Sequence, residues 1–125
     1  VRFRNAVEGI AEWSEAVRHC TFTTLDCFDF IAQCKKRDIP ENGLYVDSPW
    51  PDDGANYTHK FTEQMQRRLA KLLASFERTK IVVRFGDHPL IRKLYSESIW
   101  SWRMLKSRTQ ANSEKAEVLL TKNTL

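Results

Sequence analysis

Stretches with the apolar periodicity of helices alternate along this chain with short runs rich in β-branched and aromatic residues. Alternating helices and strands predict an α/β fold with a mostly parallel sheet and helices on both faces. The last two strands have no helix between them, so we expect an antiparallel hairpin at one edge of the sheet. The pattern predicts helices at 2–18, 27–37, 62–76 and 90–95, and strands at 21–25, 44–46, 80–85, 100–105 and 117–121.

The bulk composition limits the classes of protein to which the chain can belong. A length of 125 residues suits one domain with one core, and no apolar run is long enough to span a bilayer. We therefore expect a soluble protein without a membrane partner. The three cysteines form no CxxC pair, which favours half-buried thiols in a reducing compartment and no metal site. A net charge of +4 permits a polyanionic partner without requiring one.

Three of the predicted strands end in polar residues. Asp26 follows the strand 21–25, Asp47 follows 44–46, and Asp87 follows 80–85. Ligands of open α/β sheets bind just beyond the carboxyl ends of the strands, so these ends are the candidate site. For Asp26 and Asp87 a helix N-cap is an equally good interpretation, because aspartate is a preferred capping residue.

The turn Asp47-Ser48-Pro49-Trp50 is the least ordinary of these strand ends. Pro49 fixes its own φ and restricts Ser48 to extended geometry, so the turn is stiff. It therefore holds the Asp47 carboxylate, the Ser48 carbonyl and the Trp50 ring in fixed directions. The alternative is an ordinary turn with a tryptophan that packs in the core.

This turn resembles the DPPY motif of amino-methyltransferases that use S-adenosyl-L-methionine. The blocks "GLYVDSPWP", "YTHKFT", "KIVVRFGDHPLIRKLY" and "SRTQANSEKAEVLLTKN" together resemble the C-terminal half of D12-class, Dam-like adenine-N6 DNA methyltransferases. The resemblance implies a partial Rossmann-like methyltransferase sheet, double-stranded DNA as the partner, and no metal. It also implies a cytoplasmic protein of a bacterial or phage type, monomeric at full length.

The resemblance assigns a role to each residue of the turn. The Asp47 carboxylate and the Ser48 backbone carbonyl would accept hydrogen bonds from the adenine amino group, while Trp50 stacks on the extruded base. Two acceptors would localise the lone pair of this poor nucleophile toward the methyl group. The catalytic residues are thus expected to be Asp47, Ser48, Pro49 and Trp50.

Further roles follow from the other blocks. Asp26, Cys27 and Asp47 are expected to bind the cofactor, with the Asp26 carboxylate on the adenine amino group and the Cys27 backbone N–H beside it. The alternatives are a packing role for Phe61, a structural role for the Asp87-His88-Pro89 block, and a solvated tip for the last hairpin. The residues expected to approach the target base or DNA are Trp50, Tyr57, His59, Arg108, Gln110 and Asn112.

The chain departs from the family at two places. Ser48 stands where the family has a proline, and no glycine-rich FxGxG cofactor loop or target-recognition segment precedes the motif. We therefore expect residues 1–125 to be the C-terminal portion of a single methyltransferase catalytic domain, inactive by themselves. The alternatives are a catalytically inactive DNA-binding relative, an amino-methyltransferase acting on RNA or cytosine N4, and an α/β domain with a chance tetrapeptide.

Overall fold

The structure is a computed structural model that describes residues 7–51, 58–108 and 114–123. Helices and strands alternate from α3 to β3, and the predicted helices and strands from residue 27 onward are found within a few residues of their expected bounds. Of the helix predicted at 2–18, the structure has α2 from Ile10 to Val17, and residues 2–6 lie outside the described residues. The elements are α2 (Ile10–Val17), α3 (Cys27–Lys35), β1 (Gly43–Asp47), α4 (Glu63–Ala74), β2 (Lys80–Gly86), α5 (Pro89–Leu94), β3 (Trp100–Arg108) and β4 (Glu114–Lys122).

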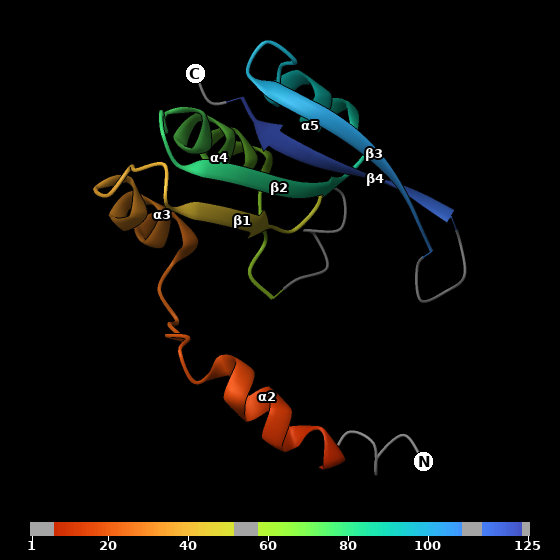
Figure 1. The fold of residues 1–125 in the computed structure, drawn as a ribbon. Helices are drawn as coiled ribbons and strands as arrows, with labels where there is room; N and C mark the ends of the chain where they lie inside the picture. Colours follow the sequence, from red (N-terminus) through yellow and green to blue (C-terminus); the bar gives the residue numbers. More distant parts are fainter. Residues whose placement is uncertain (1–6, 52–57, 109–113, 124–125) are drawn as a thin grey trace.

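The four strands form one sheet in the order β1-β2-β4-β3 (Figure 1). β1 and β2 are parallel, with Asp47 directly opposite Arg84, whereas β4 runs antiparallel to both β2 and β3. The predicted terminal hairpin is confirmed. The prediction of a mostly parallel sheet is wrong for the described residues, because the insertion of β4 beside β2 makes two of the three pairings antiparallel.

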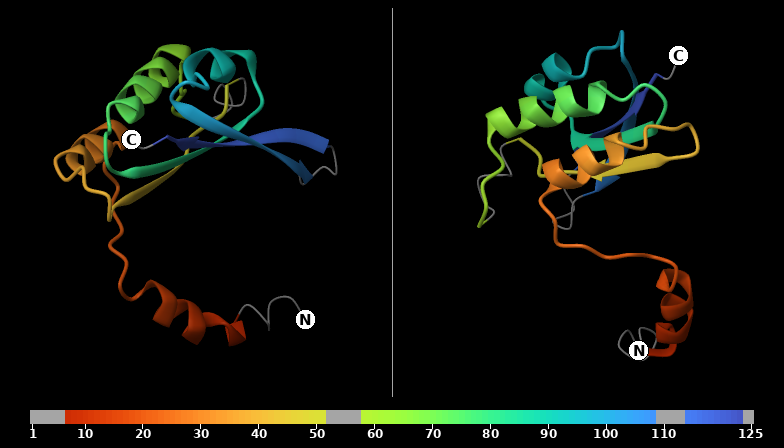
Figure 2. Two further views of the ribbon diagram at one scale, coloured as in Figure 1. Left: turned by 45° about the horizontal axis from the view of Figure 1, so that its top comes forward. Right: turned by 90° about the vertical axis from the view of Figure 1, so that its left-hand side faces the viewer.

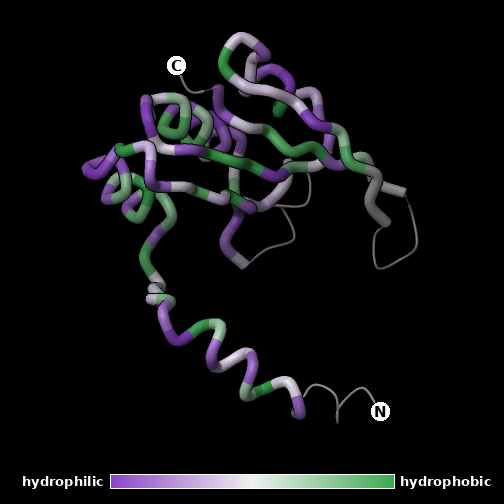
Figure 3. Tube along the Cα trace, in the orientation of Figure 1, coloured by the Kyte–Doolittle hydropathy of each residue, from purple (hydrophilic) through white to green (hydrophobic). Residues whose placement is uncertain are grey.

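Helices α3, α4 and α5 lie on one face of this sheet (Figure 2). Their apolar residues pack with alternate residues of β2 and β4 in a single core, to which Leu73, Ile81, Val83, Phe85 and Leu120 contribute fully buried side chains. Figure 3 shows hydrophobic residues along β2 and β4. Helices on both faces were expected, but α2 stands away from the opposite face and buries none of its residues.

The segment 21–25 is not a strand. Its backbone pairs with no strand among the described residues, and Phe22 and Leu25 are exposed. The β-branched and aromatic composition of the segment was the basis for the prediction. Such a preference needs a neighbouring strand and a buried face before it becomes structure, and here both are missing.

β1 is an edge strand that is only half-buried. Leu44 and Val46 pack against the core, whereas Tyr45 is 63% exposed on the uncovered face of the sheet. Strand β1 therefore buries only one of its two faces. The other edge of β1 pairs with no described strand, and residues 48–51 that follow it are half-buried.

The starts of α3, α4 and α5 are fixed by side-chain caps. Asp26 accepts a hydrogen bond from the Phe28 N–H at α3, Thr62 from the Met65 N–H at α4, and His88 from the Leu90 N–H at α5. Each cap satisfies one backbone donor that the first helical turn leaves without a partner. The predicted cap at Thr62 is confirmed, and the capping alternative for Asp26 is the arrangement observed.

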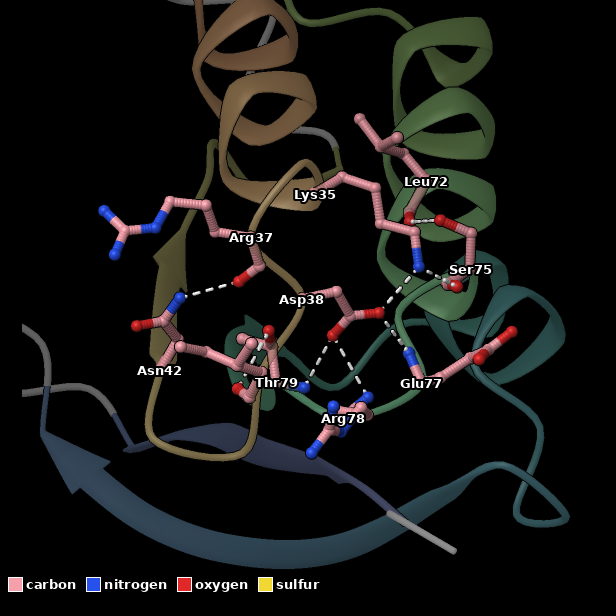
Figure 4. A network of polar contacts seen from close by, with 10 residues as sticks. Lys35, Arg37, Asp38, Asn42, Leu72, Ser75, Glu77, Arg78 and Thr79 are labelled. Atoms are coloured by element: carbon pink, nitrogen blue, oxygen red, sulfur yellow. Dashed lines mark hydrogen bonds and ion pairs between the residues drawn. The ribbon is translucent and has the colours of Figure 1, made fainter.

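Asp38 ties the loop after α3 to the loop that leads into β2 (Figure 4). Its carboxylate accepts hydrogen bonds from the backbone N–H groups of Glu77, Arg78 and Thr79, and from Lys35 Nζ at 2.7 Å. Burial alone would raise the pKa of Asp38, but these hydrogen bonds outweigh it and lower the pKa far below its usual range. The network therefore fixes where β2 begins.

Candidate functional site

A cavity of about 330 Å³ lies between β1 and α3, at the carboxyl end of β1. Three residues of the turn that follows β1, Asp47, Ser48 and Pro49, line the cavity together with Cys27 from the start of α3. Most of the remaining wall is apolar, which is typical of ligand pockets. The cavity is lined by Cys27, Phe30, Ile31, Leu44, Tyr45, Val46, Asp47, Ser48, Pro49, Phe61 and Leu69.

Asp47 ends β1 with a carboxylate that is half-exposed, at 46% of its side-chain surface. Arg84 Nη1 approaches Asp47 Oδ2 at 3.4 Å from the adjacent position of β2. The same guanidinium donates three shorter hydrogen bonds, of 2.9–3.1 Å, to the buried Glu117 of β4. These hydrogen bonds to Glu117 raise the pKa of Arg84, and Asp47 adds to that effect, so Arg84 stays charged.

Helix α4 contacts the turn that follows Asp47. The buried Gln66 donates a hydrogen bond from Nε2 to the Pro49 carbonyl at 2.7 Å. Within the described part of the chain, the Gln66 Oε1 and Ser48 Oγ atoms are buried without a hydrogen-bond partner. Proline geometry and the Gln66 contact together support the predicted stiffness of the turn.

Trp50 lies over β2 and is absent from the cavity wall. A Cβ added at Gly86 would come within 2.8 Å of its ring, so only glycine leaves room for the ring in this position. The Arg84 guanidinium lies 5.9 Å from the centre of the same ring. Trp50 thus contacts Gly86 and the core in this structure, as the packing alternative for this residue proposed.

Asp26 and Cys27 are adjacent to the cavity from the side of α3. One oxygen of Asp26 accepts the capping hydrogen bond from Phe28 at 2.9 Å, whereas Cys27 lines the cavity itself. Partial burial of the thiol raises the pKa of Cys27, and the Asp26 carboxylate adds to this increase. Taken over the whole residue, Cys20 and Cys27 are exposed and Cys34 is half-buried, so the expected half-buried thiols are found at Cys34 and, for the sulfur alone, at Cys27.

The polar residues after β2 are engaged in local structure. Asp87 forms a two-point ion pair with Arg92, at 2.7 and 2.8 Å, which lowers the pKa of Asp87. His88 accepts the capping hydrogen bond of α5 through Nδ1. These contacts agree with the structural interpretation of the Asp87-His88-Pro89 block, but the capping interpretation of Asp87 is wrong, because His88 is the N-cap of α5.

The remaining predicted residues are only partly described. Phe61 lines the cavity and stacks on Phe28, with ring centres 6.1 Å apart, while His59 is exposed and does not line it. Arg108 ends β3, where its backbone is opposite Glu114. Tyr57, Gln110 and Asn112 lie outside the described residues.

Sequence reasoning missed the residues that surround the turn. Arg84 and Glu117 are charged residues inside predicted strands, which is unusual enough to have signalled a role. Gln66 shares a helix face with Leu69, Ala70 and Leu73, so its spacing marks it as an inward-facing amide. These residues, rather than those at the strand ends, hold the turn in place.

Metal ligation and membrane insertion find no structural basis in the described segments. No group of three or more His, Cys, Asp or Glu side chains there could hold a metal ion. No described helix is both long and apolar enough to cross a membrane.

Comparison of the chain with protein-family models and with curated proteins finds no match.

Proposed function

We propose that this chain is part of a DNA methyltransferase that transfers a methyl group from S-adenosylmethionine to the N6 amine of adenine. The observation that carries the proposal is that Asp47, Ser48 and Pro49 line the same cavity as Cys27. The resemblance assigns the first three to the target amine and Cys27 to the cofactor side. A reaction between two bound groups needs both sets of residues around one space.

In this proposal the turn acts by accepting hydrogen bonds from the substrate amine. The lone pair of an exocyclic adenine amine is delocalised into the ring, so the amine is a weak nucleophile. The Asp47 carboxylate and the Ser48 carbonyl would localise that lone pair and stabilise the positive charge that the nitrogen gains. The Gln66 contact to Pro49 favours this role, because it fixes the direction in which both acceptors point.

The residues present suit part of the cofactor. When bound, S-adenosylmethionine supplies an electrophilic methyl group. Asp26, Cys27 and Asp47 would hold it, and the chemistry of this set is suitable, since carboxylates attract both an amino group and a sulfonium. The apolar cavity wall at Phe30 and Ile31 suits an adenine ring. No glycine-rich loop exists among the four scattered glycines to hold the rest of the cofactor.

A catalytically inactive DNA-binding relative is the second candidate. Trp50 rests on Gly86 and lies outside the cavity wall, and Arg84 already contacts Asp47. Both contacts use groups that the methyltransferase proposal assigns to the target base. An inactive relative would need no change in either contact.

The experiment that tests the proposal is nucleoside analysis of nucleic acid treated with the full-length protein and isotopically labelled S-adenosylmethionine. We expect label in N6-methyladenine from double-stranded DNA, and its loss in the Asp47→Ala variant. Label in N4-methylcytosine or in RNA would contradict the assigned substrate. DNA binding without label would favour the inactive relative, and an active Asp47→Ala variant would contradict the assigned role of the turn.

A further inference from the structure

We infer that Arg84 is a positioning residue for methyl transfer: anchored by Glu117, it holds one oxygen of Asp47 and leaves the other for the substrate amine. The inference rests on the proposed function, because it assigns Arg84 a task at the same site. It depends on the pair of Arg84 and Glu117, to which the resemblance assigns no role. The contacts of Arg84 with Asp47, Glu117 and Trp50 carry it.

The geometry gives Arg84 one firm partner and one loose partner. Three hydrogen bonds of 2.9–3.1 Å bind the guanidinium to Glu117, whose residue surface is only 7% exposed. The contact with Asp47 is a single one of 3.4 Å to Oδ2. A fixed guanidinium therefore orients Asp47 without using its full capacity to accept hydrogen bonds, since an ionised carboxylate has two acceptor oxygens.

The register of the sheet makes this arrangement possible. Asp47 and Arg84 are direct partners across the parallel pair of β1 and β2, and Glu117 is opposite Gly86 on the other side of β2. Arg84 itself is opposite Leu119, so its guanidinium reaches Asp47 directly across β1 and Glu117 diagonally across β4. The Asp47 carboxylate, held in this way beside the turn, would favour an amine that becomes positive as it is methylated.

Arg84 also approaches the ring that ends the turn. Its guanidinium lies 5.9 Å from the centre of the Trp50 ring, which itself rests on Gly86. One side chain thus contacts both functional ends of the turn. A bridge that served only to stabilise the sheet would have no reason to affect discrimination between bases, and this difference provides the test.

The test compares Arg84→Met with Asp47→Asn in the full-length protein. It uses DNA whose target base is either adenine or purine, which lacks the amino group. We expect Arg84→Met to lower kcat by about 10- to 100-fold, with KM for DNA changed by less than about threefold. The preference for binding adenine over purine, measured without cofactor, should fall toward one. Wild type and each variant are measured on both DNAs, so the difference in base-pair strength between adenine and purine cancels from the comparison.

Two further variants keep the test decisive. Removal of Arg84 leaves Glu117 buried without its cation, so Arg84→Met/Glu117→Gln is measured as well if the single variant fails to fold. Arg67→Met removes an exposed arginine of α4 paired with Glu63, and should leave kcat and base preference unchanged. If Asp47→Asn is inactive but a folded Arg84 variant keeps the wild-type kcat and base preference, the inference is overturned and the proposed function stands. An active Asp47→Asn variant would instead contradict the proposed function.

Discussion

The contact between Trp50 and Gly86 shows how a single residue controls the geometry of the turn. The ring occupies the space where any other residue at position 86 would carry its Cβ. Trp50 is also the last residue of the turn that begins at Asp47. Any change in the ring position is therefore transmitted to the acceptors through only three peptide bonds.

The variant Gly86→Ala should displace this ring and destabilise the protein. A Cβ 2.8 Å from a rigid ring that packs on the core forces a rearrangement, which typically costs about 1–3 kcal/mol of unfolding free energy. Urea denaturation followed by tryptophan fluorescence measures this cost. The matched control is Gly43→Ala, where the nearest atom lies at an ordinary 3.8 Å. There we expect no loss of stability, or a gain of up to about 1 kcal/mol. Equal losses for the two variants would contradict this account of Gly86.

At the level of residues, the sequence predicts those roles that depend on local chemistry. The stiff turn after β1 follows from Pro49, and Asp47, Ser48 and Pro49 do line one cavity. The pairing of Arg84 with Glu117 and Asp47 depends on which strands are neighbours and in what register. Neither can be derived from one sequence, so the residues beside the turn were missed.

The loop that precedes β2 depends on one carboxylate, which makes Asp38 the key residue at the level of elements. Three consecutive backbone N–H groups, from Glu77 to Thr79, point at its two oxygens (Figure 4). The network joins the end of α3 to the segment between α4 and β2. A protonated Asp38 side chain could not accept hydrogen bonds from all of these N–H groups equally well.

The variant Asp38→Asn should lose about 1.5–3 kcal/mol of unfolding free energy at neutral pH, as expected for hydrogen bonds to a charged acceptor. Because folding lowers the pKa of Asp38, its contribution is complete above the unfolded pKa of about 3.9 and is lost as the pH falls below it. The difference between wild type and Asp38→Asn should thus be large at pH 7 and shrink on acidification below pH 4. Urea denaturation over this range measures it.

The control for Asp38 is Asp29→Asn, an exposed acid in the first turn of α3. It should change the unfolding free energy by less than about 0.5 kcal/mol. A difference between wild type and Asp38→Asn that stayed constant from pH 7 to pH 3 would contradict the ionised clamp.

The success of the element predictions depends on burial. α4 has a full apolar stripe, and Leu69, Leu73 and the following Phe76 are buried as its spacing predicts. The segment 21–25 has the composition of a strand, but nothing among the described residues pairs with it. The sheet is less parallel than expected because strand order is a property of the whole fold and has no local signal.

At the scale of the whole molecule, α2 carries exposed apolar surface. The apolar residues Ile10, Trp13 and Val17 are exposed on α2, at 60%, 72% and 40%. One edge of β1 also pairs with no described strand. Both features agree with the proposal that further residues complete the catalytic domain and its cofactor site.

Residues 1–125 alone should therefore bind S-adenosylmethionine weakly. The chain offers Asp26, Cys27 and Asp47 for the cofactor but no glycine-rich loop. Isothermal titration calorimetry should show a dissociation constant above about 1 mM, corresponding to less than about 4 kcal/mol of binding free energy. Circular dichroism provides the control that the chain is folded. Tight binding by the isolated chain would contradict the view that part of the cofactor site is missing.

We propose that the Asp47 carboxylate acts directly on the amine that is methylated. The most direct measurement is the single-turnover rate of methyl transfer to double-stranded DNA by the full-length Asp47→Asn variant, which keeps the shape of the side chain. We predict a rate at least about 100-fold below wild type, since a charged acceptor aimed at the reacting group is lost. Asp29→Asn should react at the wild-type rate. An Asp47→Asn variant that methylated adenine as fast as the wild type would contradict the account.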